Sequence, residues 1–333
     1  MTNESIGNCL TSNLILKQII QNVLENNSNL QTEFDDSKKE YSLRLGRELF
    51  YKCSVHIHYS INPSDQFLTR KYDQKLERQH LQDIQLLLEK GADVNYTYTC
   101  NNNCEYKYEP TSQYEAISQF VDEAMDDGAT PLYVACKIGH VNVVRLLLEN
   151  GANVNQADID EKTPLYTACK EGHVNVVQLL IDYHVDINRE RKGGFTPLYI
   201  ACEMGRAVVA KLLLNKSAAV DKAAKDGFTP LYAACVQGHA PVVQLLMDNG
   251  AEIDWTNKDG STPLYIACCY GHVDATQLLL DNGAEIDRAT NGGYTPLYVA
   301  CQEGHVDVAK LLLNNGAEID RADKDGSTPL YVA

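Results

Sequence analysis

The chain has 333 residues, a formal net charge of −16 and a hydrophobic content of 44%, which is enough to build a core. Its acidic balance argues against nucleic acid or an anionic membrane surface as a partner, because both attract basic faces. It has no apolar run of the roughly 18 residues that a membrane-spanning helix needs, and its first residues lack the basic and apolar parts of a secretory signal. We therefore expect a cytoplasmic or nuclear protein.

Residues 1–65 carry mixed patterns. Apolar residues recur at helical spacing from Leu14 to Leu24, whereas "CSVHIHYSIN" alternates like a strand. Two interpretations stay open, a small helical cap or strongly decayed repeats. His56 and His58 would point to one face of such a strand, but no second ligand pair follows at a recognisable distance, so we expect no metal site.

Residues 66–95 are interpreted as a degenerate copy of a unit that recurs later in the chain. The segment "HLQDIQLLLEKGADVN" (80–95) matches "HVNVVRLLLENGANVN" (140–155) at an offset of 60 residues. This offset is one 33-residue unit, described below, plus 27 residues. A degenerate first helix is expected near residues 67–79.

The roughly 27 additional residues lie within an acidic insertion, rich in tyrosine and asparagine, at 96–126. Insertions in repeat arrays lie in loops, often on the binding side. Cys100 and Cys104 have roughly the spacing of metal ligands on a helix, but the three asparagines between them favour a loop. We therefore expect no metal here either.

The tetrapeptide TPLY recurs at a constant interval of 33 residues over the rest of the chain. It begins at Thr130, Thr163, Thr196, Thr229, Thr262, Thr295 and Thr328. In the first unit, Thr130 is a good N-cap and Pro131 suits the first position of a helix. Gly139 ends this short helix, and a second apolar helix runs to Gly151. One such unit cannot bury its apolar face alone, so the units are expected to stack.

In length and motif these units resemble the ankyrin repeat, whose usual signature has TPLH where this chain has TPLY. The resemblance covers residues 127–333 as six full repeats and a truncated seventh. It implies an all-α solenoid of stacked helix-turn-helix units with short β-hairpin-like loops. It also implies a non-catalytic protein-protein interaction scaffold or adaptor that needs no cofactor, and we expect a monomer.

The alternative is a regulatory or targeting region of a larger multidomain enzyme or channel. The chain stops at Ala333, in the first turns of a further helix. Natural arrays usually end in a polar capping repeat, so we expect the sequence to be a fragment.

Three residue types recur once in almost every unit: a cysteine in the first helix, a histidine that opens the second helix, and the tyrosine of TPLY. Equivalent atoms in stacked repeats lie roughly 8–10 Å apart, which is too far for a disulfide or for one zinc site. We therefore expect buried thiols, packing histidines and buried structural tyrosines. The sequence contains no recognisable catalytic motif.

The resemblance implies that partners are bound by the loop tips and by the exposed side of the first helix. At these positions the middle repeats carry large apolar side chains, and the only tryptophan follows on an outgoing loop. The predicted protein-binding residues are Phe195, Met204, Phe228, Val236, Trp255, Tyr270 and Tyr294, because exposed aromatic clusters serve as anchors. The alternative is that these rings pack between neighbouring loops.

The charge of the array gives an expectation about the partner. From Thr130 onward the chain has 17 basic and 25 acidic residues. We therefore expect a partner that is neutral or basic at its contact surface.

Two repeats lack the glycine that ends the second helix and have His184 or Ser217 instead. A residue with a β-carbon must adopt a strained left-handed conformation there, or end the helix differently. We expect these two junctions to be the least stable in the array.

Overall fold

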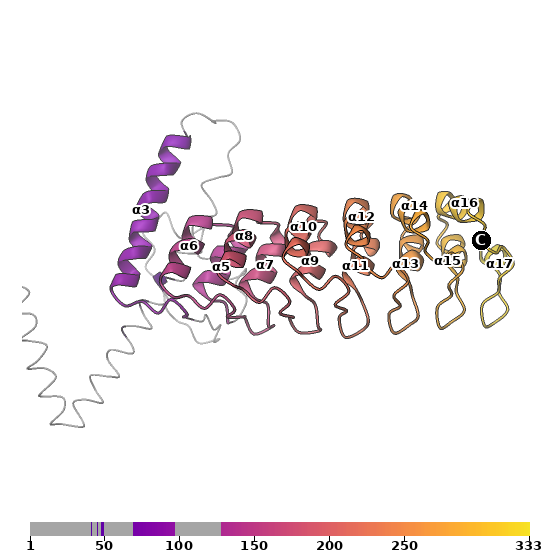
Figure 1. Cartoon of the computed structure of the whole chain (residues 1–333), viewed down its shortest axis with the longest axis horizontal. Helices are drawn as coiled ribbons and strands as arrows, with labels where there is room; N and C mark the ends of the chain where they lie inside the picture. Colours follow the sequence, from indigo (N-terminus) through magenta and orange to yellow (C-terminus); the bar gives the residue numbers. More distant parts are fainter. Residues whose placement is uncertain (1–40, 42–44, 46–47, 50–68, 97–127) are drawn as a thin grey trace, which may run out of the picture.

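The computed structural model describes residues 41, 45, 48–49, 69–96 and 128–333. Fourteen helices with defined bounds lie in these residues, and no strand does. They stand as a row of helix pairs with the loops projecting to one side, preceded by one long helix (Figure 1). The helices are α3 (Thr69–Glu89), α5 (Pro131–Ile138), α6 (Val141–Glu149), α7 (Pro164–Glu171), α8 (Val174–Asp182), α9 (Pro197–Glu203), α10 (Ala207–Asn215), α11 (Pro230–Val236), α12 (Ala240–Asp248), α13 (Pro263–Cys269), α14 (Val273–Asp281), α15 (Pro296–Gln302), α16 (Val306–Asn314) and α17 (Pro329–Val332).

The start of each first helix is set by the Thr-Pro pair. In the six complete repeats, the threonine Oγ1 accepts a hydrogen bond from the backbone N–H of the TPLY tyrosine, at 3.1–3.2 Å. The proline occupies the first turn, where its missing N–H costs nothing. At the other end, Gly139 has a φ of +90° and closes α5. The predicted helix boundaries are therefore confirmed, and they arise from local chemistry.

The stacking of the repeats creates one continuous core. Each first helix packs against the first helix of the next repeat, and each second helix does the same. In the six complete repeats, the TPLY leucine and one leucine of the second helix are at most 1% exposed: Leu132, Leu147, Leu165, Leu180, Leu198, Leu213, Leu231, Leu246, Leu264, Leu279, Leu297 and Leu312. The all-α solenoid expected from the repeat pattern is confirmed.

Helix α3 differs from the expected helix pair. It is one helix of 21 residues that continues through the stretch where the sequence predicts a first helix, a turn and a second helix. The reason is that no glycine or proline lies between Thr69 and Glu89, so nothing interrupts the helical hydrogen bonds.

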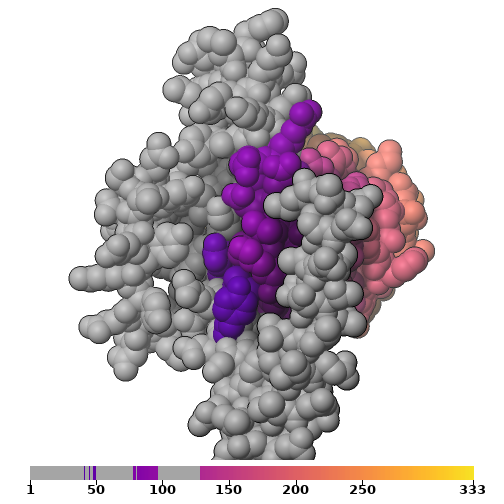
Figure 2. Space-filling view, turned by 90° about the vertical axis from the view of Figure 1, so that its left-hand side faces the viewer, coloured from indigo at the N-terminus to yellow at the C-terminus, as the bar shows by residue number. Residues whose placement is uncertain are grey.

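The C-terminal end of α3 nevertheless matches the later second helices. The backbone N–H of Ala92 donates to the Leu87 carbonyl at 3.0 Å, as the N–H of Ala152 does to Leu147 at the end of α6. Seen end-on, α3 lies over the N-terminal end of the row (Figure 2). Its Ile84 is buried in the same core as the repeats, together with Leu49.

Several sequence predictions fall on residues that the structure does not describe. These are almost all of the N-terminal region, including His56 and His58, and nearly the whole insertion, including Cys100 and Cys104. Within the described part of the chain, no helix is both long enough and apolar enough to cross a membrane.

Candidate protein-binding surface

A row of hydrogen bonds joins the edges of successive repeats. In each repeat an asparagine or aspartate after the second helix accepts, through Oδ1, the backbone N–H of a residue in the next repeat, at 2.7–3.2 Å. The acceptors are Asn95, Asn155, Asn188, Asp221, Asp254 and Asp287. All other bonds in this row span 31 positions, whereas the bond from Asn153 to Asn95 spans 58. The difference of 27 equals the length predicted for the insertion.

A second row lies at the start of the second helices. The histidine Nε2–H donates to a backbone carbonyl in the preceding repeat, 36 positions earlier, at 2.9–3.1 Å: His173 to Lys137, His239 to Glu203, His272 to Val236, and His305 to Cys269. Arg206 occupies this position in one repeat, and its Nε donates to the Lys170 carbonyl at 3.1 Å. The predicted packing role of the histidines is therefore confirmed, and Arg206 takes it over in one repeat.

The loop tips form a third row. A backbone N–H in each tip donates to a carbonyl in the preceding tip at 2.9–3.3 Å: Lys192 to Asp160, Lys225 to Gly193, Lys258 to Asp226, Asn291 to Asp259, and Lys324 to Gly292. Because three rows of hydrogen bonds fix each repeat to the next, the loops and first helices present one preformed surface.

The repeated cysteines are structural, as predicted. Cys136, Cys169, Cys202, Cys235 and Cys268 are buried, Cys301 is half-buried, and all are free thiols. Burial raises the pKa of the buried thiols, so they carry almost no reactive thiolate at neutral pH. Among the described residues, no group of three or more histidine, cysteine or acidic side chains is arranged to hold a metal ion.

The TPLY tyrosines are buried in most repeats, but not in all seven as predicted. Tyr133, Tyr166, Tyr199, Tyr232 and Tyr298 are buried, Tyr265 is half-buried, and Tyr331 is 81% exposed because no further repeat packs on it in this structure. Burial raises the pKa of Tyr265 to about 12. The pKa of Tyr166 is also raised by burial, although the nearby Arg191 acts to lower it.

Three of the predicted binding residues are rings at the loop tips, and all three are half-buried. Each packs on the TPLY tyrosine four residues later, with ring centroids 4.8–5.0 Å apart: Phe195 on Tyr199, Phe228 on Tyr232, and Tyr294 on Tyr298. Each ring is therefore partly covered by its own repeat. Sequence spacing places these rings at the tips, but it does not reveal that they fold back on their own repeat.

The residues at the ends of the first helices are more open. Met204 is 37% exposed and Tyr270 is 54% exposed. Tyr270 also stacks on His272, with ring centroids 6.2 Å apart. Val236 is half-buried and packs against the core, and its carbonyl accepts the bond from His272. Val236 is the last residue of α11, whereas Met204 and Tyr270 directly follow α9 and α13 in the repeats on either side.

Trp255 lies on the loop after the second helix α12, not at the end of a first helix. It follows Asp254, one of the acceptors in the row along the repeat edges. Its ring is half-buried, and within the described residues no ring contact joins it to the other six candidates.

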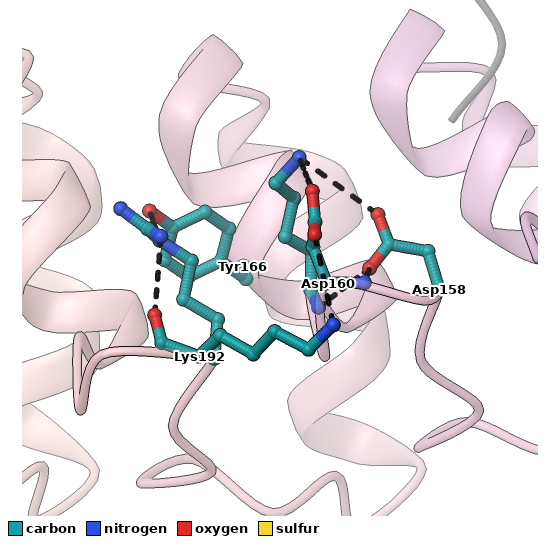
Figure 3. A network of polar contacts seen from close by, with 6 residues as sticks. Asp158, Asp160, Tyr166 and Lys192 are labelled. Carbon is teal, nitrogen blue, oxygen red and sulfur yellow. Dashed lines mark hydrogen bonds and ion pairs between the residues drawn. The ribbon is translucent and has the colours of Figure 1, made fainter. Parts of the chain in front are cut away.

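Sequence reasoning did not find the polar network between two neighbouring loop tips (Figure 3). Arg191 Nε donates to the Tyr166 hydroxyl at 2.7 Å, and its guanidinium lies over the Phe195 ring, 4.3 Å from the centroid. Nearby, Asp160 pairs with Lys162 at 3.1 Å and with Lys192 at 3.9 Å. The sequence signal was the arginine at a loop position where other repeats have aspartate, asparagine, threonine or alanine.

Comparison with known proteins finds a matching family model and matching solved structures. A family model for ankyrin repeats (3 copies) matches residues 111–191, 188–257, 243–323 and 290–333. The crystal structure of the human ASB11 ankyrin repeat domain matches with a TM-score of 0.58 and 32% sequence identity, over 62% of this chain and 92% of that domain.

The comparisons do not identify a partner. No curated protein matches the chain. Among the solved structures, 550 chains match, so the fold is common, and a common fold does not by itself specify a function.

Proposed function

Because the chain belongs to the ankyrin repeat family, we propose that it is a non-catalytic scaffold or adaptor. It binds another protein through the surface made by the loop tips and first-helix ends between Phe195 and Tyr294. The repeats of this family generally mediate protein-protein interaction, and the proposal assigns that role to one part of this array.

The observation that carries the proposal is the exposure of two large apolar side chains at equivalent positions. Met204 and Tyr270 each directly follow a first helix, and both are exposed. The same position holds the half-buried Ile138 in the first repeat and Glu171, Gln237 or Glu303 in the others. A few exposed apolar anchors supply most of the affinity in a typical interface, so this stretch is favoured as the centre of contact.

The rigidity of the surface supports the same proposal. The hydrogen-bonded rows hold the loops and first helices before any partner arrives, and a preformed surface loses little conformational entropy on binding. The half-buried rings at Phe195, Phe228 and Tyr294 then add apolar edges beside the exposed anchors.

The charge of the second half of the array supports a proposal about the charge of the partner's contact surface. Residues 229–333 contain five basic and fourteen acidic residues, a net charge of −9. We propose that the partner is neutral or basic where it lies against this half, which favours fast association at low salt. We also place the protein in the cytoplasm as a monomer, where the free thiols of the repeats stay reduced.

The test is affinity enrichment with the full chain as bait, followed by quantitative mass spectrometry. The informative variant combines Met204→Ser with Tyr270→Ala, because both side chains are exposed and their loss leaves the core intact. Proteins bound through the proposed surface should be depleted at least tenfold with this variant.

The matched control is Val208→Ala, which removes an exposed apolar side chain from α10, away from the proposed surface. It should retain the same proteins as the unmodified chain. If the double variant retains them equally well, the proposed surface is not the binding surface.

A further inference from the structure

The positive charge of the array is concentrated in one stretch. Residues 188–228 contain eight basic and four acidic residues, a net charge of +4, although the array as a whole is acidic. The preceding residues 128–187 have four basic and seven acidic residues, a net charge of −3, and the following half of the array is still more acidic. A basic band therefore crosses an otherwise acidic surface.

Within this band the side chain of Arg191 is held in place from several sides. Its Nε donates to Tyr166 Oη at 2.7 Å, and Nη1 donates to the Lys192 carbonyl at 3.2 Å. The guanidinium carbon lies 4.3 Å from the ring centroid of Phe195 and 5.6 Å from that of Tyr166. Because stacking and hydrogen bonds fix the guanidinium plane, little rotamer entropy is left to lose when a ligand binds.

The fixed guanidinium still has donors to offer. An arginine has five N–H groups, and among the described residues Arg191 uses two. No ion pair in the described part of the chain joins Arg191 to a carboxylate, and the neighbouring loop-tip Asp160 pairs with Lys162 and Lys192 instead.

We propose that Arg191 binds an oxyanion on the partner polypeptide, the carboxylate of an aspartate or glutamate or a phosphate group. The fork of parallel N–H donors matches the two oxygens of such a group, and hydrogen bonds between charged groups are the stronger kind. The inference rests on the proposed function and specifies the chemistry of the partner at the Phe195 end of the surface.

The charge pattern also gives the partner a direction. A partner segment matches the two potentials of the array when its acidic side chain lies over residues 188–228 and its neutral or basic residues lie over 229–333. The opposite orientation places like charges together along the whole surface, and such contacts disfavour binding. The partner segment therefore runs with its acidic end toward Arg191.

The experiment selects peptides on the immobilised full chain from two pools. One is a displayed random dodecapeptide library, which carries only carboxylates. The other is a synthetic library with a fixed central phosphoserine. Peptides enriched on the unmodified chain should contain an acidic residue at a fixed distance from an apolar residue, or should depend on the phosphate. Their affinity should fall about tenfold or more with Arg191→Gln.

Two further variants separate geometry from charge. Arg191→Lys keeps the charge but loses the planar fork, and it should weaken binding nearly as much as Arg191→Gln. Lys225→Gln removes one exposed positive charge from the next loop tip and should change affinity by less than about twofold. Circular dichroism and thermal melting confirm that each variant is folded.

The outcomes distinguish the two proposals. Two results overturn the role of Arg191 and leave the proposed function standing. In one, peptides bind through Tyr270 but show no preference for acidic groups; in the other, they keep that preference with Arg191→Gln. Peptides that depend on neither Tyr270 nor Arg191 overturn the proposed function as well. Equal losses with Lys225→Gln and Arg191→Gln overturn the specific role of Arg191 and leave only a diffuse charge effect.

Discussion

Ser217 ends helix α10 with a backbone φ of +62°, and replacing it by glycine is expected to stabilise the array. The left-handed conformation costs a residue with a β-carbon about 1–2 kcal/mol. The greater freedom of glycine in the unfolded chain offsets about 0.5–1 kcal/mol of the gain. The net change is about +0.5–1 kcal/mol in the free energy of unfolding. The serine side chain is exposed, so its loss removes no packing.

His184 occupies the equivalent position one repeat earlier, with a φ of +59°. The hydrogen bond that closes this helix end, from Val185 N–H to the Leu180 carbonyl, is 3.3 Å long, against 3.0 Å for the bond that follows Gly250. His184→Gly should therefore give a similar gain. The two sites lie one repeat apart and their side chains share no partner, so the effects should add.

The measurement is urea unfolding of the full chain, with native-state hydrogen exchange to locate the change. The double variant should raise the urea midpoint without changing the slope and should increase amide protection at the ends of α8 and α10. Gly250→Ala is the reciprocal control, because Gly250 has a φ of +82° and a β-carbon there meets no atom within 4 Å. It should cost about as much as Ser217→Gly gains.

Two results would refute this reasoning. One is a Ser217→Gly variant with unchanged or lower stability while Gly250→Ala is destabilised. The other is uniform amide protection at all helix ends of the unmodified chain, because strain at only two junctions predicts lower protection at those two.

Three further predictions concern single side chains. Gly238→Ala should cost about 2–5 kcal/mol in an unfolding titration, because the new β-carbon would overlap His272 Nδ1 and combine backbone strain with overpacking; a loss below about 1 kcal/mol would contradict the close contact. Burial and the nearby Glu285 raise the pKa of Asp254, so the folded state holds its proton more tightly and is less stable above that pKa. Asp254→Asn should therefore raise the melting temperature at pH 7, and the gain should shrink below pH 3.8, whereas an equal gain at both pH values would rule out the charge as its cause. Because the pKa of Tyr265 rises to about 12 on folding, stability should fall between about pH 10 and 12 as the unfolded chain loses phenol protons first; Tyr265→Phe should reduce this fall in a thermal-melting series, and an identical pH profile would count against it.

The fold was predictable because its signals are local and repeated. The threonine cap, the proline and the terminal glycine act within a few residues of one another, and the 33-residue interval then determines how the units stack. Even His184 and Ser217 could be singled out, since the φ that the position requires depends only on the helix end. Helix α3 shows the limit of this approach, because the match to later repeats did not reveal that the helix continues unbroken from Thr69.

The candidate surface was less predictable, because its details depend on contacts between repeats. The sequence placed Phe195 at a loop tip but did not show that its ring packs on Tyr199 and under Arg191. The partner of Arg191 is Tyr166, 25 residues earlier, and no local pattern connects them. The spacing of charges along the chain likewise does not show which ions are paired with each other and which remain open to a partner.

The bonds that join the repeats connect residues 31, 32 or 36 positions apart, and every one of these intervals is preserved when 33 consecutive residues are removed or duplicated. An insertion or deletion of whole 33-residue units therefore lengthens or shortens the array without breaking any row. A change of another size has to be absorbed in a loop, as the 58-residue span from Asn95 to Asn153 illustrates. The architecture thus tolerates a change in the number of whole repeats, and such a change would move or duplicate a complete loop tip together with its side chains.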